Sequence, residues 1–484
     1  MKTGDEYFDS EEFREILEEY ERAVNTGQPV FMDADELAEI ADFYQMQGQM
    51  EEAEAAIRLA LSLSPGAIAP LTYRIHEALY EGNVEAAKDY LSQIIDKDEP
   101  DYIYDTAEIM LAEGRIDEAD AYLRETFKTV PPDEYQDYVV DVASLYQDWG
   151  ISDKAMEWMS RARHEDTPEF KELMARTLFG LGKYKDSEKL FNELIDTDPF
   201  QKRYWNALAS AQFMNEDYSN AVQSSEYAIA IDPEDAEGLI AKANGLYRLN
   251  NYKEALEYFR RYSERVPDDE FAYLHQGTCL INMNDNEGAL EMLKKAERLA
   301  AVDSPYLPDI YQEQSFAYGE LGDIDQALAC LDKTDTLDCD HIGIMVIKGH
   351  VLLSAGRVEE AEQMFRNAIH ESEHEIDDEK PGWNSARTLM RVIVSLYDNK
   401  YVEAAYKMFR KFFDMVDRDF DEGYAYMALC CFDLEKYDEF LKYLKKACQR
   451  NPKECRLVLS QLFPEDMEPE QYYEYIKGRM KSEE

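Results

Sequence analysis

The chain has 484 residues, of which 45% are apolar and only 21 are Gly and 16 are Pro. This composition excludes global disorder, and the scarcity of turn-forming residues favours long helices over a sandwich or a barrel. The 103 acidic residues outnumber the 51 basic ones, and the net charge of -52 disfavours nucleic-acid and membrane partners because it repels phosphate groups.

The first residues, MKTGDEYFDS, lack the apolar core of a signal peptide, and the chain shows no run of 18 apolar residues. The seven cysteines form no C-x-x-C pair and are odd in number, which favours free thiols in a reducing cytoplasm. Residues 10–25 form a predicted helix with one apolar side, which we expect to cap the rest of the fold. That side comprises Phe13, Ile16, Leu17, Tyr20 and Val24.

From residue 34 onward, two kinds of punctuation recur with a period of about 34 residues. Proline marks the end of one helix and the start of the next, since it cannot continue a helix but is accepted in a first turn. The prolines are Pro65, Pro100, Pro131, Pro168, Pro199, Pro233, Pro267 and Pro305. A second mark lies midway, where a left-handed residue is expected after a helix. It comprises Gly48, Gly82, Gly114, Gly150, Gly182, Glu216, Asn250, Asn284, Gly322 and Gly356.

Each period therefore predicts a helical hairpin. Small residues recur at one place in the first helices, such as Ala41, Gly277 and Gly349, and at one place in the second helices, such as Ala53 and Ala404. Small side chains at both places allow the two helix backbones to approach closely. Twelve hairpins are predicted, starting near residues 34, 68, 100, 136, 168, 202, 236, 270, 308, 342, 385 and 421.

These marks resemble the tetratricopeptide repeat (TPR) family, whose pattern is matched by Trp205, Leu208, Ala209, Ala221 and Pro233. The block from 252 to 259, YKEALEYF, is likewise typical of the family. The resemblance covers roughly residues 34–452. It implies an all-α fold, a right-handed superhelical solenoid of about twelve helix-turn-helix repeats with capping helices at both ends.

In the TPR family, the first helices line a concave surface that binds peptides or partner helices. Carried over to this chain, the resemblance predicts a partner-binding groove in the fifth to seventh repeats, rich in Arg, Asn and aromatic residues. Its residues are Arg176, Phe179, Arg203, Asn206, Ser210, Phe213, Asn244, Tyr247 and Arg248. A set of merely solvated side chains remains the alternative.

The flanking parts of the predicted groove differ in character. The N-terminal part is acidic through Asp35, Asp42, Asp101, Glu108, Asp137 and Asp148. The C-terminal part is apolar through Leu274, Ile281, Phe316, Val346, Leu353, Leu389, Ile393, Leu429 and Phe432. An acidic entrance followed by an apolar trough suits a basic amphipathic helix.

The repeat phase breaks once, at a longer acidic loop near residues 371–384. The sequence there begins with an H-E-x-x-H string from His370 through Glu371 to His374, the arrangement that binds zinc in some proteases. The string lies at the end of a predicted second helix, without a third ligand or a sheet edge for substrate. We therefore expect no catalytic role, no metal and no cofactor, and a zinc-dependent hydrolase remains a minor alternative.

Two helices are predicted after the last repeat, over 456–463 and 469–481, and we interpret them as caps. A basic run of Lys442, Lys445, Lys446, Arg450, Lys453 and Arg456 precedes and enters them. This run either faces solvent or meets the acidic N-terminal helix of another copy, so that self-association is possible.

The sequence thus predicts three segments: an acidic N-terminal cap over 1–33, a repeat array over 34–452 and C-terminal capping helices over 453–484. The leading functional hypothesis is a non-catalytic cytoplasmic scaffold or adaptor that binds a protein segment, possibly basic, in its concave groove. An acidic chaperone for a basic client is the alternative. A further interpretation is that the high acidity serves only to keep the protein soluble.

Overall fold

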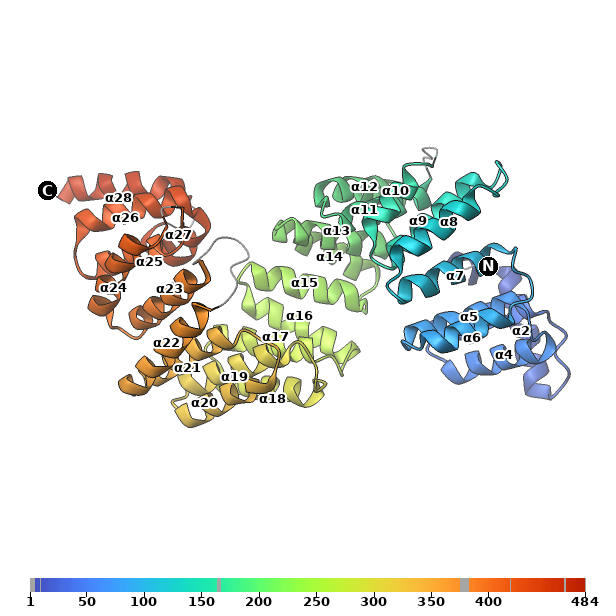
Figure 1. Ribbon diagram of the computed structural model, residues 1–484, viewed down its shortest axis with the longest axis horizontal. Helices are drawn as coiled ribbons and strands as arrows, with labels where there is room; N and C mark the ends of the chain where they lie inside the picture. The colour runs from blue at the N-terminus through green and yellow to red at the C-terminus, as the bar shows by residue number, and fades with distance from the viewer. Residues whose placement is uncertain are drawn as a thin grey trace. The chain divides into compact units, whose positions relative to one another are not determined.

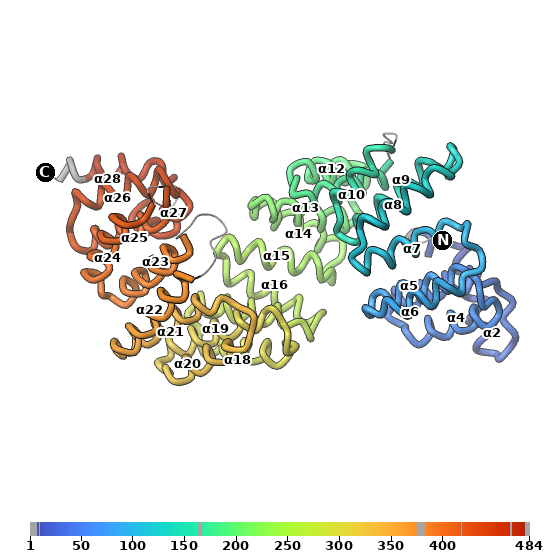
Figure 2. Tube along the Cα trace, in the orientation of Figure 1, coloured from blue at the N-terminus to red at the C-terminus, as the bar shows by residue number. Residues whose placement is uncertain are grey.

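In the computed structural model, all regular structure within the described residues is helical; these residues are 5–8, 10–162, 167–374, 383–417, 419–464 and 467–483. The chain divides into two compact units, Met1–Ile231 and Asp232–Glu484 (Figures 1 and 2). Among the described helices, none has both the length and the apolar character needed to span a bilayer.

The first unit begins with two helices that precede the repeats, α1 (Asp5–Phe8) and α2 (Glu11–Thr26). Six helical hairpins follow, in which each odd-numbered helix contacts the next helix in the chain. They are α3 (Ala34–Met46) with α4 (Met50–Leu63), α5 (Ile68–Tyr80) with α6 (Val84–Gln93), α7 (Pro100–Ala112) with α8 (Ile116–Phe127), α9 (Tyr135–Asp148) with α10 (Ser152–Met159), α11 (Pro168–Gly180) with α12 (Tyr184–Thr197), and α13 (Lys202–Met214) with α14 (Tyr218–Ile231).

The second unit continues the same pattern and ends with additional helices. Its hairpins are α15 (Ala236–Arg248) with α16 (Tyr252–Arg265), α17 (Glu270–Asn282) with α18 (Asn286–Leu299), α19 (Leu307–Glu320) with α20 (Ile324–Asp332), α21 (His341–Ser354) with α22 (Val358–Ser372), α23 (Trp383–Asp398) with α24 (Val402–Met415), and α25 (Tyr424–Asp433) with α26 (Tyr437–Arg450). A 3-10 turn, η1 (Lys333–Thr336), follows α20, and α27 (Pro452–Leu459), η2 (Ser460–Leu462) and α28 (Pro469–Glu483) close the unit.

The predicted all-α array of hairpins is confirmed, and the helix pairs are compatible with the expected count. First helices begin at Ala34, Ile68, Pro100, Tyr135 and Pro168, within one residue of the predicted starts. The right-handed superhelical path and the division at residues 33 and 452 stay predictions. Of the longer loop predicted near 371–384, residues 375–382 lie outside the described ranges.

A left-handed residue follows the first helix of every hairpin, because the chain must reverse there within a few residues. All ten residues that the sequence singled out have positive φ, from 60° at Asn250 to 80° at Gly322. Lys400 and Glu435 take the same conformation, at 69° and 57°, in the last two hairpins. Neither position was predicted, because the repeat period by which Glu216 was recognised is interrupted near residues 371–384, before both of them.

Close approach of the paired helices depends on the recurring small residues. Ala41 and Ala53 are both buried in the first hairpin, with 0% and 1% of their surface exposed. A methyl group added to Gly349 on α21 would lie 2.4 Å from a ring carbon of Phe365 on α22, which meets it in the hairpin. The prediction for α24 is wrong by one residue, since Ala404 is only partly buried and Ala405 fills the buried position. Ala405 follows the left-handed Lys400 at the same interval at which Ala53 follows Gly48, so the buried position keeps its place in the hairpin.

Both ends carry the expected additional helices. In the first unit, Phe13 and Tyr20 of α2 are buried in the cluster formed with α3 and α4, whereas Val24 is 54% exposed. In the second unit, Tyr472 of α28 stacks on Phe463 with ring centroids 3.7 Å apart. These contacts cover the apolar faces of the first and last hairpins, as caps do in repeat proteins.

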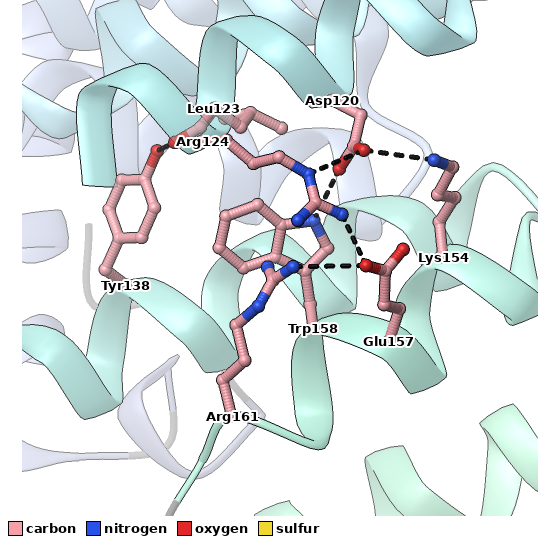
Figure 3. A network of polar contacts seen from close by, with 8 residues as sticks. All are labelled: Asp120, Leu123, Arg124, Tyr138, Lys154, Glu157, Trp158 and Arg161. Atoms are coloured by element: carbon pink, nitrogen blue, oxygen red, sulfur yellow. Dashed lines mark hydrogen bonds and ion pairs between the residues drawn. The ribbon is translucent and has the colours of Figure 1, made fainter. Parts of the chain in front are cut away.

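A polar network joins the second helices α8 and α10 within the first unit (Figure 3). Asp120 of α8 accepts hydrogen bonds from Arg124 at 2.8 Å, from Lys154 at 3.0 Å and from the indole N–H of Trp158 at 3.0 Å. Burial opposes ionisation of Asp120, but these three donors hold the pKa of its carboxyl below the usual range. Because each donor is a cation or a buried N–H, the network fixes adjacent hairpins to each other.

Candidate functional site

The first helices of successive hairpins contact one another from α3 to α11, so their outward faces form one continuous surface in the first unit. Carboxyl groups gather on it because they recur at helical spacing. Asp101, Asp105 and Glu108 lie at intervals of four and three residues on α7, and Asp137 and Asp141 are four residues apart on α9. Together with Asp35 and Asp42 of α3, these residues make up the acidic surface, which has seven members; six are at least partly exposed and one, Asp105, is buried.

Burial, with a smaller contribution from neighbouring carboxylates, opposes ionisation of several groups on this surface. Burial raises the pKa of Asp42 to about 6, with the charge of His76 acting in the opposite direction. Burial also raises the pKa of Asp35 and that of Asp141, and in both cases Asp101 adds to the shift. These residues come from three helices, so they influence one another's pKa only because the fold brings the helices together.

His76 of α5 is a positive group set into this acidic surface. Its Nε2 atom lies 3.3 Å from Asp105 Oδ1 and 3.1 Å from Glu108 Oε2. Burial lowers the pKa of the imidazole, but the two carboxylate hydrogen bonds outweigh it and raise the pKa of His76 to about 10. Burial raises the pKa of Asp105, which is only 2% exposed, whereas the bonds from His76 and Trp149 keep that of Glu108 low despite burial.

The sequence predicted part of this surface. All five of the predicted acids that belong to it lie on first helices: Asp35, Asp42, Asp101, Glu108 and Asp137. The prediction missed His76, Asp105 and Asp141, although the repeat period contains a signal for the histidine. His76 stands 34 residues after Asp42 and 32 before Glu108, so the three occupy one position of successive repeats.

The predicted Arg/Asn/aromatic groove is distributed over both units, and its arginines in the first unit have acidic partners. Arg176 pairs with Asp148 at 3.0 Å, and Arg203 pairs with Glu172 at 3.2 Å. Acidic side chains from outside the predicted set thus adjoin the groove at these positions. The cause is spatial, since each acid lies on the first helix of the preceding hairpin.

The remaining groove residues of the first unit are partly or fully packed. Phe179 and Phe213 contact Tyr184 and Tyr218 edge-on, with ring centroids 5.5 and 5.3 Å apart. Asn206 is only 2% exposed. Ser210 is half-buried.

In the second unit, Asn244 and Tyr247 of α15 are partly buried, and the exposed Arg248 completes the predicted set. The ring of Tyr247 lies 5.7 Å from that of His275 on α17. A binding role for the nine predicted residues stays a prediction.

The predicted apolar trough is largely used by the protein itself. Leu274, Val346, Leu353 and Ile393 are buried, with at most 5% of their surface exposed, because they pack into the hydrophobic core. Phe316, at 50%, is exposed. The four buried residues therefore hold hairpins together, a role that helical periodicity alone does not separate from partner binding.

A cavity of about 430 Å³ nevertheless opens in the second unit, between α21, α23 and α25. Its apolar lining includes Ile344, Ile347, Met390, Val394 and Tyr426. Asp340 and Arg391 also line this cavity and form an ion pair 3.1 Å long.

The H-E-x-x-H string lies at the end of α22, as expected. The rings of His370 and His374 are 5.0 Å apart and nearly perpendicular, and the His370 side chain is 72% exposed. Within the described ranges, the sole group of three residues that brings metal-ligand atoms together is His76, Asp105 and Glu108. The string therefore lacks a third ligand among the described residues.

Three family models match parts of the chain. A tetratricopeptide repeat model matches residues 173–236, and a second one matches residues 37–66 and 422–454. The model of anaphase-promoting complex, cyclosome, subunit 3 matches residues 214–296. The chain is a tetratricopeptide repeat protein. The matched segments coincide with helical hairpins in both units of this TPR protein.

Curated relatives are distant. The TPR protein is 24% identical over 221 residues to protein FlbA of Caulobacter vibrioides, covering 38% of this chain and 36% of FlbA. It is 23% identical over 216 residues to N-alpha-acetyltransferase 16, NatA auxiliary subunit, of Mus musculus, covering 43% of this chain and 24% of the relative. The chain thus spans little more than a third of the length of FlbA and about a quarter of the other relative.

Several solved structures also match the chain, each at low sequence identity. The APC/C hetero-tetramer Cut9-Hcn1 matches 90% of this chain and 97% of its own, with 16% identity and a TM-score of 0.34. The pilus biogenesis factor PilW matches 44% of this chain and 96% of its own, with 17% identity and a TM-score of 0.38. A tetratricopeptide repeat protein from Parabacteroides merdae matches 58% of this chain and 97% of its own, with 13% identity and a TM-score of 0.38.

Proposed function

We propose that this TPR protein is a non-catalytic scaffold whose acidic surface binds a basic segment of a partner protein. The observation that carries the proposal is the crowding of seven carboxyl groups on the first helices α3, α7 and α9, with burial and like charge raising several of their pKa values. Lysine or arginine side chains relieve such repulsion, and they gain charge-assisted hydrogen bonds in doing so.

Geometry supports a segment of protein as the ligand. The acidic groups extend over successive helices, so a partner must present several cations along its length. An extended or helical basic peptide meets this requirement. The seven cysteines are free, five of them with at most 3% of their surface exposed, which supports a reducing compartment such as the cytoplasm.

The proposal is tested with the full chain and a labelled peptide that carries Lys and Arg on one helical face. We expect fluorescence anisotropy to show saturable binding that weakens as salt screens the charges. The triple variant Asp42→Asn, Asp101→Asn, Asp141→Asn should weaken binding at least about tenfold, since each lost ion pair at a partly buried interface contributes about 0.5–1 kcal/mol.

A matched control separates a local surface from net charge. Asp89, Asp117 and Asp186 are exposed on the second helices α6, α8 and α12, so the corresponding triple Asn variant removes the same charge elsewhere. We expect it to change affinity less than about twofold, because remote exposed charges are screened. Equal weakening by both triples would show that binding follows only the total charge, and the proposal would fail.

The second candidate, an acidic chaperone for a basic client, is favoured by the net charge of -52 over the whole chain. A chaperone should suppress aggregation of an unfolded basic protein in light-scattering assays, and both triples should then act alike. Loss of binding in the acidic-surface triple variant alone, with the control triple variant unaffected, supports the scaffold instead.

A further inference from the structure

We propose that His76, Asp105 and Glu108 form a binding site for one divalent transition-metal ion of the zinc class. Asp105 and Glu108 also belong to the acidic surface, but none of these three residues is altered in the acidic-surface variants, so the two proposals are tested separately. His76 lies on α5, while Asp105 and Glu108 lie one turn apart on α7. The two adjacent first helices therefore supply three ligands to one point.

Distances between the ligand atoms fit one shared ion. His76 Nε2 lies 3.3 Å from Asp105 Oδ1 and 3.1 Å from Glu108 Oε2, and all three atoms lie within 4.8 Å of one another. Zinc binds nitrogen and oxygen at about 2.0–2.1 Å in tetrahedral geometry, which places neighbouring ligand atoms roughly 3.3 Å apart. The separations from His76 are thus those that a tetrahedral site requires.

Donors outside the trio orient both carboxylates. Thr72, one turn before His76 on α5, donates its hydroxyl proton to Asp105 Oδ2 at 2.7 Å. The indole N–H of Trp149, at the end of α9, donates to Glu108 Oε1 at 3.1 Å. Each carboxylate therefore directs its other oxygen toward His76. Such outer hydrogen bonds fix ligand orientation in metal sites, and here they come from groups that are not ligands.

The chemistry of the donors selects the metal. One imidazole and two carboxylates suit zinc and its neighbours, whereas calcium and magnesium prefer oxygen ligands alone. The His76 side chain is 55% exposed, so the open side of the site faces solvent and leaves room for water as a fourth ligand. Ligation requires that the Nε2 atom of His76 carry no proton, because a metal ion and a proton compete for the same lone pair.

The test uses the full chain, freed of metal with a chelator and titrated with zinc by calorimetry. We expect one zinc per chain. No stoichiometric zinc, or zinc that binds only at many weak sites, would overturn the proposal.

Variants locate the ion. His76→Gln and Glu108→Gln should each lower zinc affinity at least about tenfold, and Trp149→Phe, which removes an orienting N–H, should lower it by about 10- to 100-fold. His374→Gln serves as the matched control, since it removes a histidine of the H-E-x-x-H string and should leave binding unchanged. Zinc loss in His374→Gln with retention in His76→Gln would place the ion at the string and refute this site. Circular dichroism of each variant checks that it is folded.

Discussion

Glu313 lies in the second unit on α19 and carries a carboxyl group that burial makes hard to ionise. Burial raises the pKa of Glu313 to about 7, and Asp309, one turn earlier on the same helix, adds to the shift. Glu313 in turn contributes, after burial, to the raised pKa of Tyr247, about 12, on α15. The folded protein therefore holds a proton on Glu313 that the unfolded chain releases at a lower pH.

The free energy of unfolding should accordingly fall as pH rises from about 4.5 to about 7, since the native state binds the additional proton in that window. Glu313→Gln removes this dependence and should make the second unit more stable at pH 8 than the wild type, by up to about 3 kcal/mol. Urea unfolding of both proteins at pH 5 and pH 8 measures the difference.

Glu320→Gln is the control for this prediction. Glu320 is exposed at the end of the same helix, so its substitution removes an equal charge without a burial effect. If the two variants gain equal stability at pH 8, the cause is reduced net charge and not the buried position of Glu313.

Positions set by local backbone geometry were predictable from sequence, whereas side-chain partners were not. The left-handed conformations of Gly48 and Asn250 follow from the residue that comes after a helix. The pairing of Arg203 with Glu172 depends on which helices are neighbours, and periodicity does not encode it. His76 was missed for a different reason: the predicted acidic part of the groove contained only carboxylates, although the repeat period places this histidine between Asp42 and Glu108.

At the scale of one element, the packing of α21 against α22 depends on a glycine, Gly349, which has no side chain. A Cβ atom at Gly349 would meet ring carbons of Phe365 at 2.4, 2.7 and 2.9 Å. Glycine in a helix normally weakens it by about 1 kcal/mol relative to alanine. Here the contact with α22 reverses that rule, because overpacking costs about 1–3 kcal/mol.

We therefore expect Gly349→Ala to destabilise the protein by about 1–2 kcal/mol, measured by chemical denaturation. Gly319→Ala is the matched control, since Gly319 is also helical but has no atom within 4 Å of its added methyl group. It should be neutral or stabilise by up to about 1 kcal/mol. Stabilisation by both substitutions would show that Phe365 moves aside without cost.

Helix pairing was predictable at this scale because small residues, prolines and turns all carry the same period. The exception is α24, where Ala405 and not Ala404 is buried. Two consecutive alanines left the small-residue pattern without a way to distinguish them, because the turn residue Lys400, which fixes the position, was not recognised from the sequence.

At the scale of the whole molecule, the net charge of -52 should oppose folding through repulsion within the chain. The screening length falls from about 30 Å at 0.01 M salt to about 8 Å at 0.15 M. We expect the melting temperature at pH 7.5 to rise by roughly 5 °C over this range of sodium chloride, which differential scanning calorimetry detects.

The same titration near the sequence isoelectric point of about 4.4 provides the control, because net charge is then close to zero. Salt should have little effect there. A rise of equal size at both pH values would identify a general salt effect and contradict the role of charge. At this scale the sequence predicted a repeat protein well, since hairpins stack by nearest-neighbour contacts.

The tryptophans offer a way to observe the two units separately by fluorescence. Trp149, Trp158 and Trp205 lie in the first unit and Trp383 alone lies in the second. Trp158 is 0% exposed, with its indole N–H bound to Asp120, so its emission should shift to longer wavelength only when the first unit unfolds. Replacing Trp383 with Phe makes the emission spectrum a reporter of the first unit alone. The difference between the wild-type and variant emission spectra then reports unfolding of the second unit through Trp383 alone.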